Sequence, residues 1–169
     1  MSRLLQWRSL AGLALQLAIL ALLVTAFFMR ASQVWGPSMS PSIAPGEYVL
    51  IDTFAYRFGT PRRGDVVAFH ADDGVHDVFI KRVVGLPGDR IRIERGVVYV
   101  DGAALAEPYV RYPDQRSFPG VLVPADSVYV LGDNRADSDD SRSFGAVPDG
   151  RIVGRALAGI WPPSFVRAL

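Results

Sequence analysis

The sequence predicts a mainly β protein, in which a single N-terminal transmembrane helix precedes an antiparallel β-sheet domain. The first observation is an uncharged, apolar run over residues 10–29, LAGLALQLAILALLVTAFFM. The second is that helical periods end after this run, and short segments rich in Val, Ile, Tyr and Phe alternate with turns. These segments follow one another too closely for the helical crossovers that parallel strands need, so we expect antiparallel pairing.

The N-terminal run has the length of a membrane-crossing helix. Residues 10–29 suffice to span the ~30 Å of hydrocarbon in a bilayer. Arg3 and Arg8 precede the run, which favours an N-terminus in the cytoplasm. A cleaved signal peptide is the alternative, because residues 24–26 (Val-Thr-Ala) resemble the small-residue pattern before a cleavage site. The apolar run continues through residues 27–29, and this continuation favours a retained anchor.

The expected domain organisation follows from this anchor. Residues 1–30 form a cytoplasmic stub and the anchor, and residues 31–169 form one extracytoplasmic domain of modest size. Residues 90–102, RIRIERGVVYVDG, predict a hairpin whose turn is at 95–96 (Arg-Gly). Residues 103–126 carry four prolines and weak periodicity, which predicts a small subdomain or surface excursion. The candidate strands are residues 47–54, 65–70, 78–85, 90–94, 97–102, 127–133 and 151–161.

Composition excludes some function classes and singles out one residue. The net charge of +1 gives no electrostatic footprint for nucleic acid, and the absence of cysteine excludes disulfides and thiolate metal sites. Of the 18 Lys and Arg residues, only Lys81 is a lysine, and it lies in the apolar stretch FIKRVVG. Arginine cannot lose its proton in a protein, whereas a buried lysine can become a neutral base. Chance is the alternative explanation for a single lysine.

Three stretches contain side chains suited to chemistry. They are GPSMSPS at residues 36–42, Lys81 itself, and GDNRADSDDSRSFG at residues 132–145. Ser38 is not in a nucleophile elbow, because that motif requires Gly where Ser40 stands. The acids of the third stretch lack the spacing of a calcium-binding loop. Taken alone, each stretch is also compatible with an ordinary surface loop or strand.

The two histidines offer little support for other chemistry. His70 and His76 both lie in FHADDGVHDV, which is typical of an acidic hairpin tip, so a solvated turn is favoured over a Ser-His-Asp triad. A metal site formed by His70, Asp72, His76 and Asp77 would lack a third imidazole or a thiol. We therefore expect no metal there.

Taken in order, the three stretches resemble the bacterial type I signal peptidases. That family's serine box reads S-M-x-P-T, its lysine box K-R-x-x-G-x-P-G-D, and its last box G-D-N-R-x-x-S-x-D-S-R-x-x-G. This chain has SMSPS from Ser38, KRVVGLPGD from Lys81 and GDNRADSDDSRSFG from Gly132. The matches run from about residue 32 to residue 148. The resemblance implies a signal-peptidase-type catalytic domain built on an antiparallel β-sheet, with a small inserted excursion.

The resemblance also implies roles for individual residues. Ser38 falls on the nucleophile of the family and Lys81 on its general base. Ser138 falls on the hydroxyl that orients the lysine ammonium, and Asp140 and Arg142 fall on an acid–base pair that holds the last box in shape. The positions that match the shallow pockets for small substrate side chains are Val34, Met39 and Ile80.

Two departures from the family pattern bear on the site. Ser42 replaces the threonine after the serine-box proline and keeps the hydroxyl. Gly36 stands where some members have a serine that completes the oxyanion hole, so the hole must rely on the Ser38 backbone N–H and a neighbouring amide. Pro37 has no N–H and is excluded as the second donor.

The function implied by the resemblance is removal of signal peptides from secretory preproteins, with cleavage after small residues of the Ala-x-Ala type. Lysine acts as a base only when neutral, so the pKa of Lys81 must fall by ~2 units, and burial is the expected cause. The Ser-Lys dyad works through an acyl-enzyme and needs no metal or cofactor. The expected partners are preproteins and the lipid bilayer, without nucleic acid, and the expected enzyme is a monomer in the bacterial cytoplasmic membrane.

Two alternatives remain open. One is a dedicated processing peptidase of the same fold, acting on a conjugative pilin or in an organelle's inner membrane. The other, from a different class, is a catalytically silent, membrane-tethered β domain that binds partners. The intact Ser38 and Lys81 positions argue against the silent domain.

Overall fold

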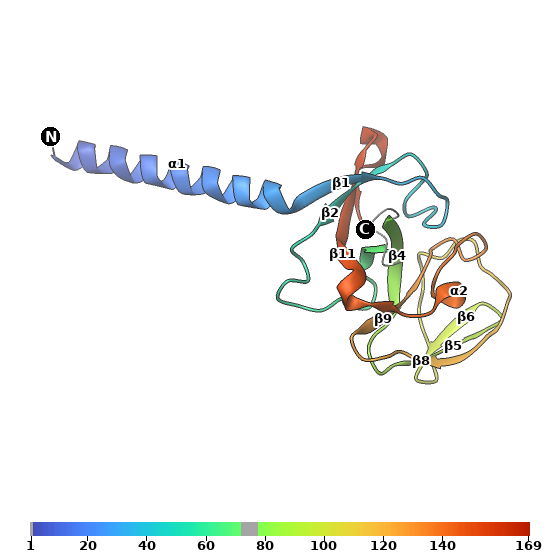
Figure 1. Ribbon diagram of the computed structural model, residues 1–169. Coiled ribbons are helices and arrows are strands. Elements are labelled where there is room, and N and C mark those ends of the chain that lie inside the picture. The colour runs from blue at the N-terminus through green and yellow to red at the C-terminus, as the bar shows by residue number, and fades with distance from the viewer. Residues whose placement is uncertain (1, 72–77) are drawn as a thin grey trace.

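The structure is a computed structural model that describes residues 2–71 and 78–169. Its first element, α1 (Ser2–Phe28), extends away from the β domain, with the N-terminus at its far end (Figure 1). Measured over the described residues, no helix combines the length and the apolar character that a membrane crossing requires. The anchor expected over residues 10–29 therefore stays a prediction.

Most of the β domain belongs to one antiparallel sheet. Over the described residues this sheet has eight strands in the order β1-β2-β11-β3-β4-β9-β10, and β12 pairs with β11. The strands are β1 (Met29–Gln33), β2 (Tyr48–Asp52), β3 (Val66–His70), β4 (Val78–Gly85), β9 (Ser127–Leu131), β10 (Val147–Pro148), β11 (Ile152–Trp161) and β12 (Arg167–Ala168). The last six residues of β4 are all buried, which is the pattern of a strand covered on both faces.

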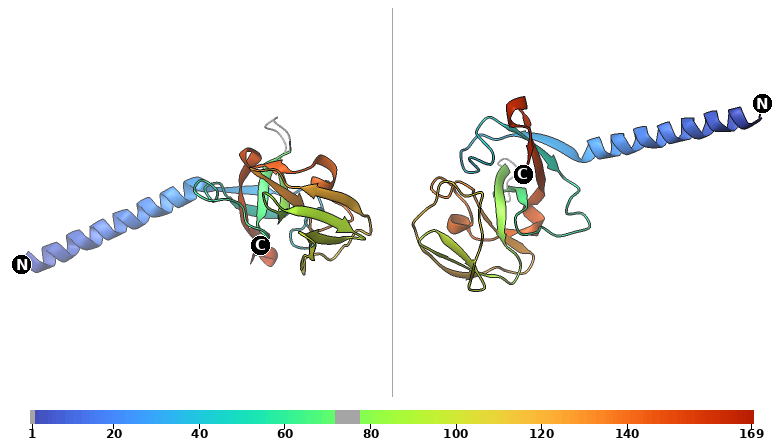
Figure 2. Two further views of the ribbon diagram at one scale, coloured as in Figure 1. Left: turned by 90° about the horizontal axis from the view of Figure 1, so that it is seen from below. Right: turned by 180° about the vertical axis from the view of Figure 1, so that it is seen from behind.

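A smaller sheet lies on the side of the domain away from α1 (Figures 1 and 2). In the part of the chain that is described it has four strands, in the order β7-β6-β5-β8. They are β5 (Arg90–Glu94), β6 (Val97–Val100), β7 (Ala103–Ala104) and β8 (Phe118–Leu122). In β5 the exposed and buried residues alternate strictly, as expected for a strand with one face on the core.

The predicted hairpin is confirmed. β5 pairs with β6 through a turn at Arg95 and Gly96, whose φ angles of 46° and 81° match the positive values that a two-residue hairpin turn requires. The predicted strands over residues 78–85 and 90–94 coincide with β4 and β5. Residues 103–126 supply β7 and β8 to the smaller sheet, which they share with this hairpin.

The two sheets share a core through β9. Ile91, Ile93 and Val98 of the smaller sheet form one buried cluster with Tyr129 and Leu131 of β9. β9 also pairs with β4, so one strand both packs against the smaller sheet and pairs with the strand that contains Lys81. The short elements that complete the fold are α2 (Ser141–Phe144) and two 3₁₀ turns (Asp149–Arg151 and Pro163–Phe165).

Candidate active site

The structure brings Ser38 and Lys81 together although 43 positions separate them. Ser38 lies in the turn that follows β1, and Lys81 lies in the middle of β4. The Lys81 Nζ atom is 2.9 Å from the Ser38 Oγ atom and 3.2 Å from the Ile80 carbonyl oxygen. A hydroxyl and an amine at this distance can exchange a proton directly.

The surroundings of Lys81 favour its neutral form. The side chain is only 5% exposed, and its Nζ lies 5.1 Å from the centre of the Phe79 ring. Burial lowers the pKa of Lys81 from its ordinary value of 10.5 to about 8, and the negative charges of Asp140 and Asp139 oppose part of this shift. Near pH 8 a large share of the molecules therefore has a neutral amine beside the serine.

Ser38 is positioned by a tight turn with a buried anchor. The Ser40 N–H donates to the Pro37 carbonyl at 2.9 Å, and the Ile43 N–H donates to the Met39 carbonyl at 2.8 Å. Met39 and Ile43 are fully buried in the core beside β2 and β3. Because the residue after Ser38 is held in the core, the hydroxyl of Ser38 has little freedom to move away from Lys81.

The stretch after β9 packs directly against the turn of residues 36–40 that contains Ser38, which we call the serine turn. The Asn134 N–H donates to the Ser38 carbonyl at 3.0 Å, and the Asn134 side-chain amide donates to the Pro37 carbonyl at 3.3 Å. Gly132 lies so close that a Cβ atom there would be 2.5 Å from the Ser38 carbonyl oxygen and 2.3 Å from the Ser138 Oγ atom. Glycine at 132 is therefore required by this close approach.

Asp140 organises the same stretch from a fully buried position. Its carboxylate accepts hydrogen bonds from the Gly132 N–H at 3.0 Å and from the Ser138 hydroxyl at 2.7 Å. It also accepts from two guanidinium nitrogens of Arg142, at 2.7 and 2.8 Å. Asp140 caps α2, since it receives the Arg142 backbone N–H. The contact between Asp140 and Arg142, expected from the resemblance, is present.

Ser138 makes a different contact from the expected one. Within the described residues its hydroxyl donates to Asp140, and no hydrogen bond joins it to Lys81. Donation to Asp140 leaves the lone pairs of the Ser138 oxygen available to accept from an ammonium, but the Lys81 Nζ atom is directed at Ser38 and the Ile80 carbonyl in this structure. The orienting role of Ser138 toward the Lys81 ammonium therefore stays a prediction.

A cleft of about 610 Å³ opens over Ser38 and Lys81. Val34, Met39 and Ile80 all line it, as the resemblance implies. β9 pairs with β4 only from Arg82 onward, so residues 78–81 keep one strand edge that no described strand covers. The complete lining is Ser32, Gln33, Val34, Trp35, Gly36, Pro37, Ser38, Met39, Val78, Phe79, Ile80, Lys81, Asp137 and Asp139.

Sequence reasoning missed some residues of this site. Asp137 and Asp139 line the cleft, and Asn134 holds the serine turn. All three lie in residues 132–145, a stretch that the sequence analysis singled out without assigning a role to these residues. Their spacing alone gives no indication of a contact with residues a hundred positions earlier. No local signal identifies Asn134, because the carbonyl that its amide contacts is 97 positions earlier in the chain.

The metal site weighed from the sequence involves the segment between β3 and β4. Among the described residues no group of three His, Cys, Asp or Glu side chains is suited to hold a metal ion. Asp72, His76 and Asp77 lie outside the described residues. His70 is the member that the structure describes, and its buried Nδ1 atom has no hydrogen-bond partner there.

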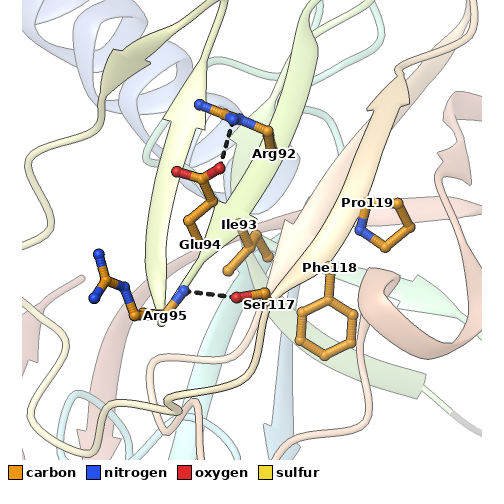
Figure 3. A pocket seen from close by; sticks show the side chains of 7 residues that line it. All are labelled: Arg92, Ile93, Glu94, Arg95, Ser117, Phe118 and Pro119. Carbon is orange, nitrogen blue, oxygen red and sulfur yellow. Dashed lines mark hydrogen bonds and ion pairs between the residues drawn. The ribbon is translucent and has the colours of Figure 1, made fainter.

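A second hollow of about 510 Å³ lies over the smaller sheet, between β5 and β8 (Figure 3). Two of its charged lining residues, Arg92 and Glu94, form an ion pair with each other. The Arg95 backbone N–H donates to the Ser117 hydroxyl at its base. This hollow holds none of the candidate catalytic residues.

Comparisons with known proteins agree with this geometry. The family described as "Signal peptidase, peptidase S26" matches residues 7–161. A "Probable signal peptidase I-2" of Synechocystis is 38% identical over an alignment of 161 positions, which covers 92% of this chain and 74% of that protein. "Signal peptidase IB" of Staphylococcus aureus is 32% identical over an alignment of 177 positions, which covers 94% of this chain and 90% of that protein.

A solved structure gives the same result for the fold. A signal peptidase I from Enterococcus faecalis matches with a TM-score of 0.51 and 30% identity, over 57% of this chain and 96% of the other. The family match spans most of the chain, and the relatives named above share about a third of their residues with it. The chain therefore belongs to the signal peptidase family, peptidase S26, and is a serine peptidase.

Proposed function

We propose that this protein removes N-terminal signal peptides from secreted preproteins, with Ser38 as the nucleophile and Lys81 as the general base. The observation that carries the proposal is the 2.9 Å contact between a buried lysine amine and a serine hydroxyl inside one cleft. A lysine that served only as a structural cation would be expected to pair with a carboxylate. Lys81 forms no such ion pair within the described residues.

The acylation step uses both side chains. The neutral Lys81 amine takes the hydroxyl proton of Ser38 while the Ser38 Oγ atom attacks the carbonyl carbon of the scissile peptide bond. The resulting ammonium of Lys81 then gives that proton to the leaving amine, the C–N bond breaks, and an acyl-enzyme ester remains on Ser38. The pKa of about 8 suits this double role, because the group must accept and return a proton at similar pH.

Deacylation reverses the proton movements with water in place of the leaving amine. The neutral amine of Lys81 takes a proton from a water molecule, and the hydroxide so formed attacks the ester carbonyl. The ester C–O bond breaks, the proton on Lys81 returns to the Ser38 oxygen, and the signal peptide leaves with a free carboxyl group. Each step balances without metal or cofactor.

The Ser38 backbone N–H is the proposed oxyanion donor. Pro37 carries no N–H, and the Gly36 position offers no side chain. A Cβ atom built on Gly36 meets no heavy atom within 4 Å, so a serine there would have room. The oxyanion hole thus depends on main-chain donors. In other enzymes, removal of one oxyanion-hole donor lowers kcat by ~10²–10³.

Specificity for small residues before the cleaved bond is supported by the lining of the cleft. Val34, Met39 and Ile80 are apolar, and each is at most 8% exposed, so this part of the cleft offers an apolar surface to small side chains such as that of alanine. The uncovered edge of residues 78–81 allows the preprotein to bind as an additional extended strand.

The proposed location is the bacterial cytoplasmic membrane, with residues 10–29 as a single-pass anchor and residues 31–169 outside the cytoplasm. The uncharged sequence of this segment and the preceding arginines support the proposal. Protease accessibility in spheroplasts tests it, since the catalytic domain should be digested from outside. A mature protein that begins at Phe27 would contradict the retained anchor.

The function itself is tested with the purified full chain in detergent and a preprotein whose signal ends in Ala-x-Ala. We expect one cut after the second alanine, identified by sequencing the new N-terminus. Ser38→Ala should abolish the cut while the circular dichroism spectrum stays unchanged. A panel of pilin precursors in the same assay separates general processing from a dedicated role, and an active Ser38→Ala variant would overturn the proposal.

A further inference from the structure

We propose that Asn134 is a positioning residue, whose side-chain amide holds the Pro37–Ser38 peptide in the orientation that directs the Ser38 N–H toward the oxyanion. This inference rests on the proposed function, because it concerns the donor of the Ser38 hole. It adds a residue that touches neither the substrate nor the dyad side chains.

The argument begins with the shape of a peptide unit. The Pro37–Ser38 peptide is trans, so its C=O and N–H groups lie in one plane and point in opposite directions. Fixing the direction of the Pro37 carbonyl therefore fixes the direction of the Ser38 N–H. No separate contact to the N–H is needed, and such a contact would occupy the donor that the reaction requires.

The Pro37 carbonyl is held by two donors. The Asn134 side-chain amide reaches it at 3.3 Å and the Ser40 N–H at 2.9 Å. Among the described residues, no group accepts a hydrogen bond from the Ser38 N–H. This donor is thus free while the opposite end of its own peptide unit is fixed.

The next peptide unit is held from the same residue. The Asn134 backbone N–H donates to the Ser38 carbonyl at 3.0 Å, so Asn134 binds the carbonyl before the nucleophile and the carbonyl of the nucleophile itself. The close approach of Gly132 to the Ser38 carbonyl prevents that peptide from rotating toward β9. The two contacts of Asn134 separate experimentally, since a substitution removes the side-chain contact and leaves the backbone one.

Asn134 is itself anchored away from the cleft. Its position forms a backbone bridge with Tyr112, and the Ala136 N–H donates to the Tyr112 carbonyl at 3.2 Å. Because a fixed residue loses little further freedom on holding its partner, a single amide suffices to orient the peptide. Without this amide the Pro37 carbonyl would be held by the Ser40 N–H alone, so Ser38 and Lys81 would stay in place while the Pro37–Ser38 plane gained freedom to tilt.

The test uses Asn134→Ala and the isosteric Asn134→Asp, whose carboxylate accepts hydrogen bonds and cannot donate to a carbonyl. We expect kcat to fall by about 10- to 100-fold, a part of the loss seen when an oxyanion donor is deleted outright. In Asn134→Ala, KM and the pH midpoint of the rate should not change, because substrate strand binding and Lys81 are untouched. The added carboxylate of Asn134→Asp raises the pKa of Lys81, so kcat of that variant is compared on its own pH plateau. Rates are normalised to the folded fraction measured by circular dichroism.

A second readout is specific to the oxyanion. A peptide aldehyde forms a hemiacetal with Ser38 and mimics the transition state, so its affinity should fall by the same factor as kcat. A substrate analogue with a methylene in place of the scissile carbonyl should bind equally to all variants. Adding Gly36→Ser, which supplies a new donor, should restore part of the loss in Asn134→Ala. Tyr112→Phe, which keeps the backbone bridge, is the matched control.

The outcomes distinguish this inference from the proposed function. If Ser38→Ala is inactive and both Asn134 variants stay within about twofold of the wild type, the positioning role is wrong and the dyad stands. A loss that appears in KM, or a shifted pH midpoint, in the uncharged Asn134→Ala variant also overturns it, because Asn134 would then act through the substrate or Lys81. An active Ser38→Ala variant overturns the proposed function itself.

Discussion

One strand of each sheet, β4 in the larger and β5 in the smaller, places charged side chains in opposite environments. In the larger sheet, β4 contains the consecutive residues Lys81 and Arg82, which are only 5% and 8% exposed. In the smaller sheet, β5 places Arg92 and Glu94 on the solvent face, where their side chains are 49% and 47% exposed. The difference indicates that charge is buried in this fold where it acts on a reacting group or holds its neighbours, and stays exposed elsewhere.

The sheets are joined by ion pairs as well as by their shared core. Arg135 binds Glu107, and Arg142 binds Asp114 at 2.9 Å, so two residues of the stretch after β9 reach the segment between β7 and β8. That stretch also contacts Ser38 through Asn134. The smaller sheet therefore contributes to the site by holding the residues that hold the nucleophile.

The largest expected effect comes from Lys81→Arg. This change keeps the charge and approximate length, so a structural cation would survive it, but guanidinium stays protonated and cannot accept the Ser38 proton. Loss of a general base costs ~10²–10⁴ in rate, and more where nucleophile and base act as a unit. We expect Lys81→Arg to be as inactive as Ser38→Ala in the preprotein assay.

The control for Lys81→Arg is its fold. Circular dichroism and gel filtration should match the wild type, and rates are normalised to the folded fraction because the buried guanidinium has no counter-charge. Processing at a near wild-type rate by Lys81→Arg would contradict the Ser-Lys mechanism and make the lysine a structural cation after all.

The next largest effect concerns the buried pair beside Lys81. Arg82 donates to Asp133 at 2.9 and 2.7 Å, and Asp133 is fully buried. Asp133→Asn leaves the guanidinium without its counter-charge, and breaking such a pair costs about 3–5 kcal/mol. We expect the free energy of unfolding, measured with urea, to fall by that amount. A loss below about 1 kcal/mol would remove the contrast drawn between the two sheets.

The pH dependence of the rate should follow the lowered pKa of Lys81. Below a pKa of about 8 the neutral fraction falls tenfold per pH unit, so kcat/KM should rise from pH 6 and level off above about pH 8. The measurement is the pH profile of the wild type in single-turnover assays. A profile that still rises at pH 10 would show that burial does not lower this pKa.

The lowered pKa of Lys81 also predicts how stability depends on pH. The dependence is opposite in direction to that of an ion-paired lysine, whose pKa is raised by folding. The pKa is lower in the folded protein than the ordinary 10.5, so between pH 8 and 10.5 the unfolded chain binds more protons. Stability should therefore rise with pH in that window, by at most about 1.4 kcal/mol per unit. Lys81→Met should remove this rise, which equilibrium unfolding at several pH values measures.

Sequence patterns predicted the parts of the fold that local chemistry determines. The apolar run of β4, the alternation of β5 and the Arg95-Gly96 turn each follow from a few adjacent residues. β8 was not predicted, because FPGVL contains a proline and a glycine and becomes a strand only by pairing with β5. Strand partners far along the chain leave no local pattern.

In the candidate active site, too, motifs identify individual residues, whereas contacts between distant segments leave no sequence pattern. Ser38, Lys81, Asp140 and Arg142 are recognisable from motifs, and the structure places them together. The contacts of Asn134 with the serine turn were not predictable, since they depend on how β9 lies against residues 36–40. The motif does not show which groups the Ser138 hydroxyl contacts, and in this structure it donates to Asp140.

The smallest expected effect is Glu94→Gln in the smaller sheet, the counterpart of Asp133→Asn. The Arg92–Glu94 pair is about half exposed on both sides, where water and salt already satisfy the charges. Exposed pairs of this kind contribute about 0–1 kcal/mol, so the urea midpoint should move little and the residual difference should vanish at high salt. The processing rate should stay unchanged, because Glu94 lies outside the catalytic cleft. A loss of stability comparable to that of Asp133→Asn would show that exposed charge is as important to this fold as buried charge, and the comparison of the two sheets would fail.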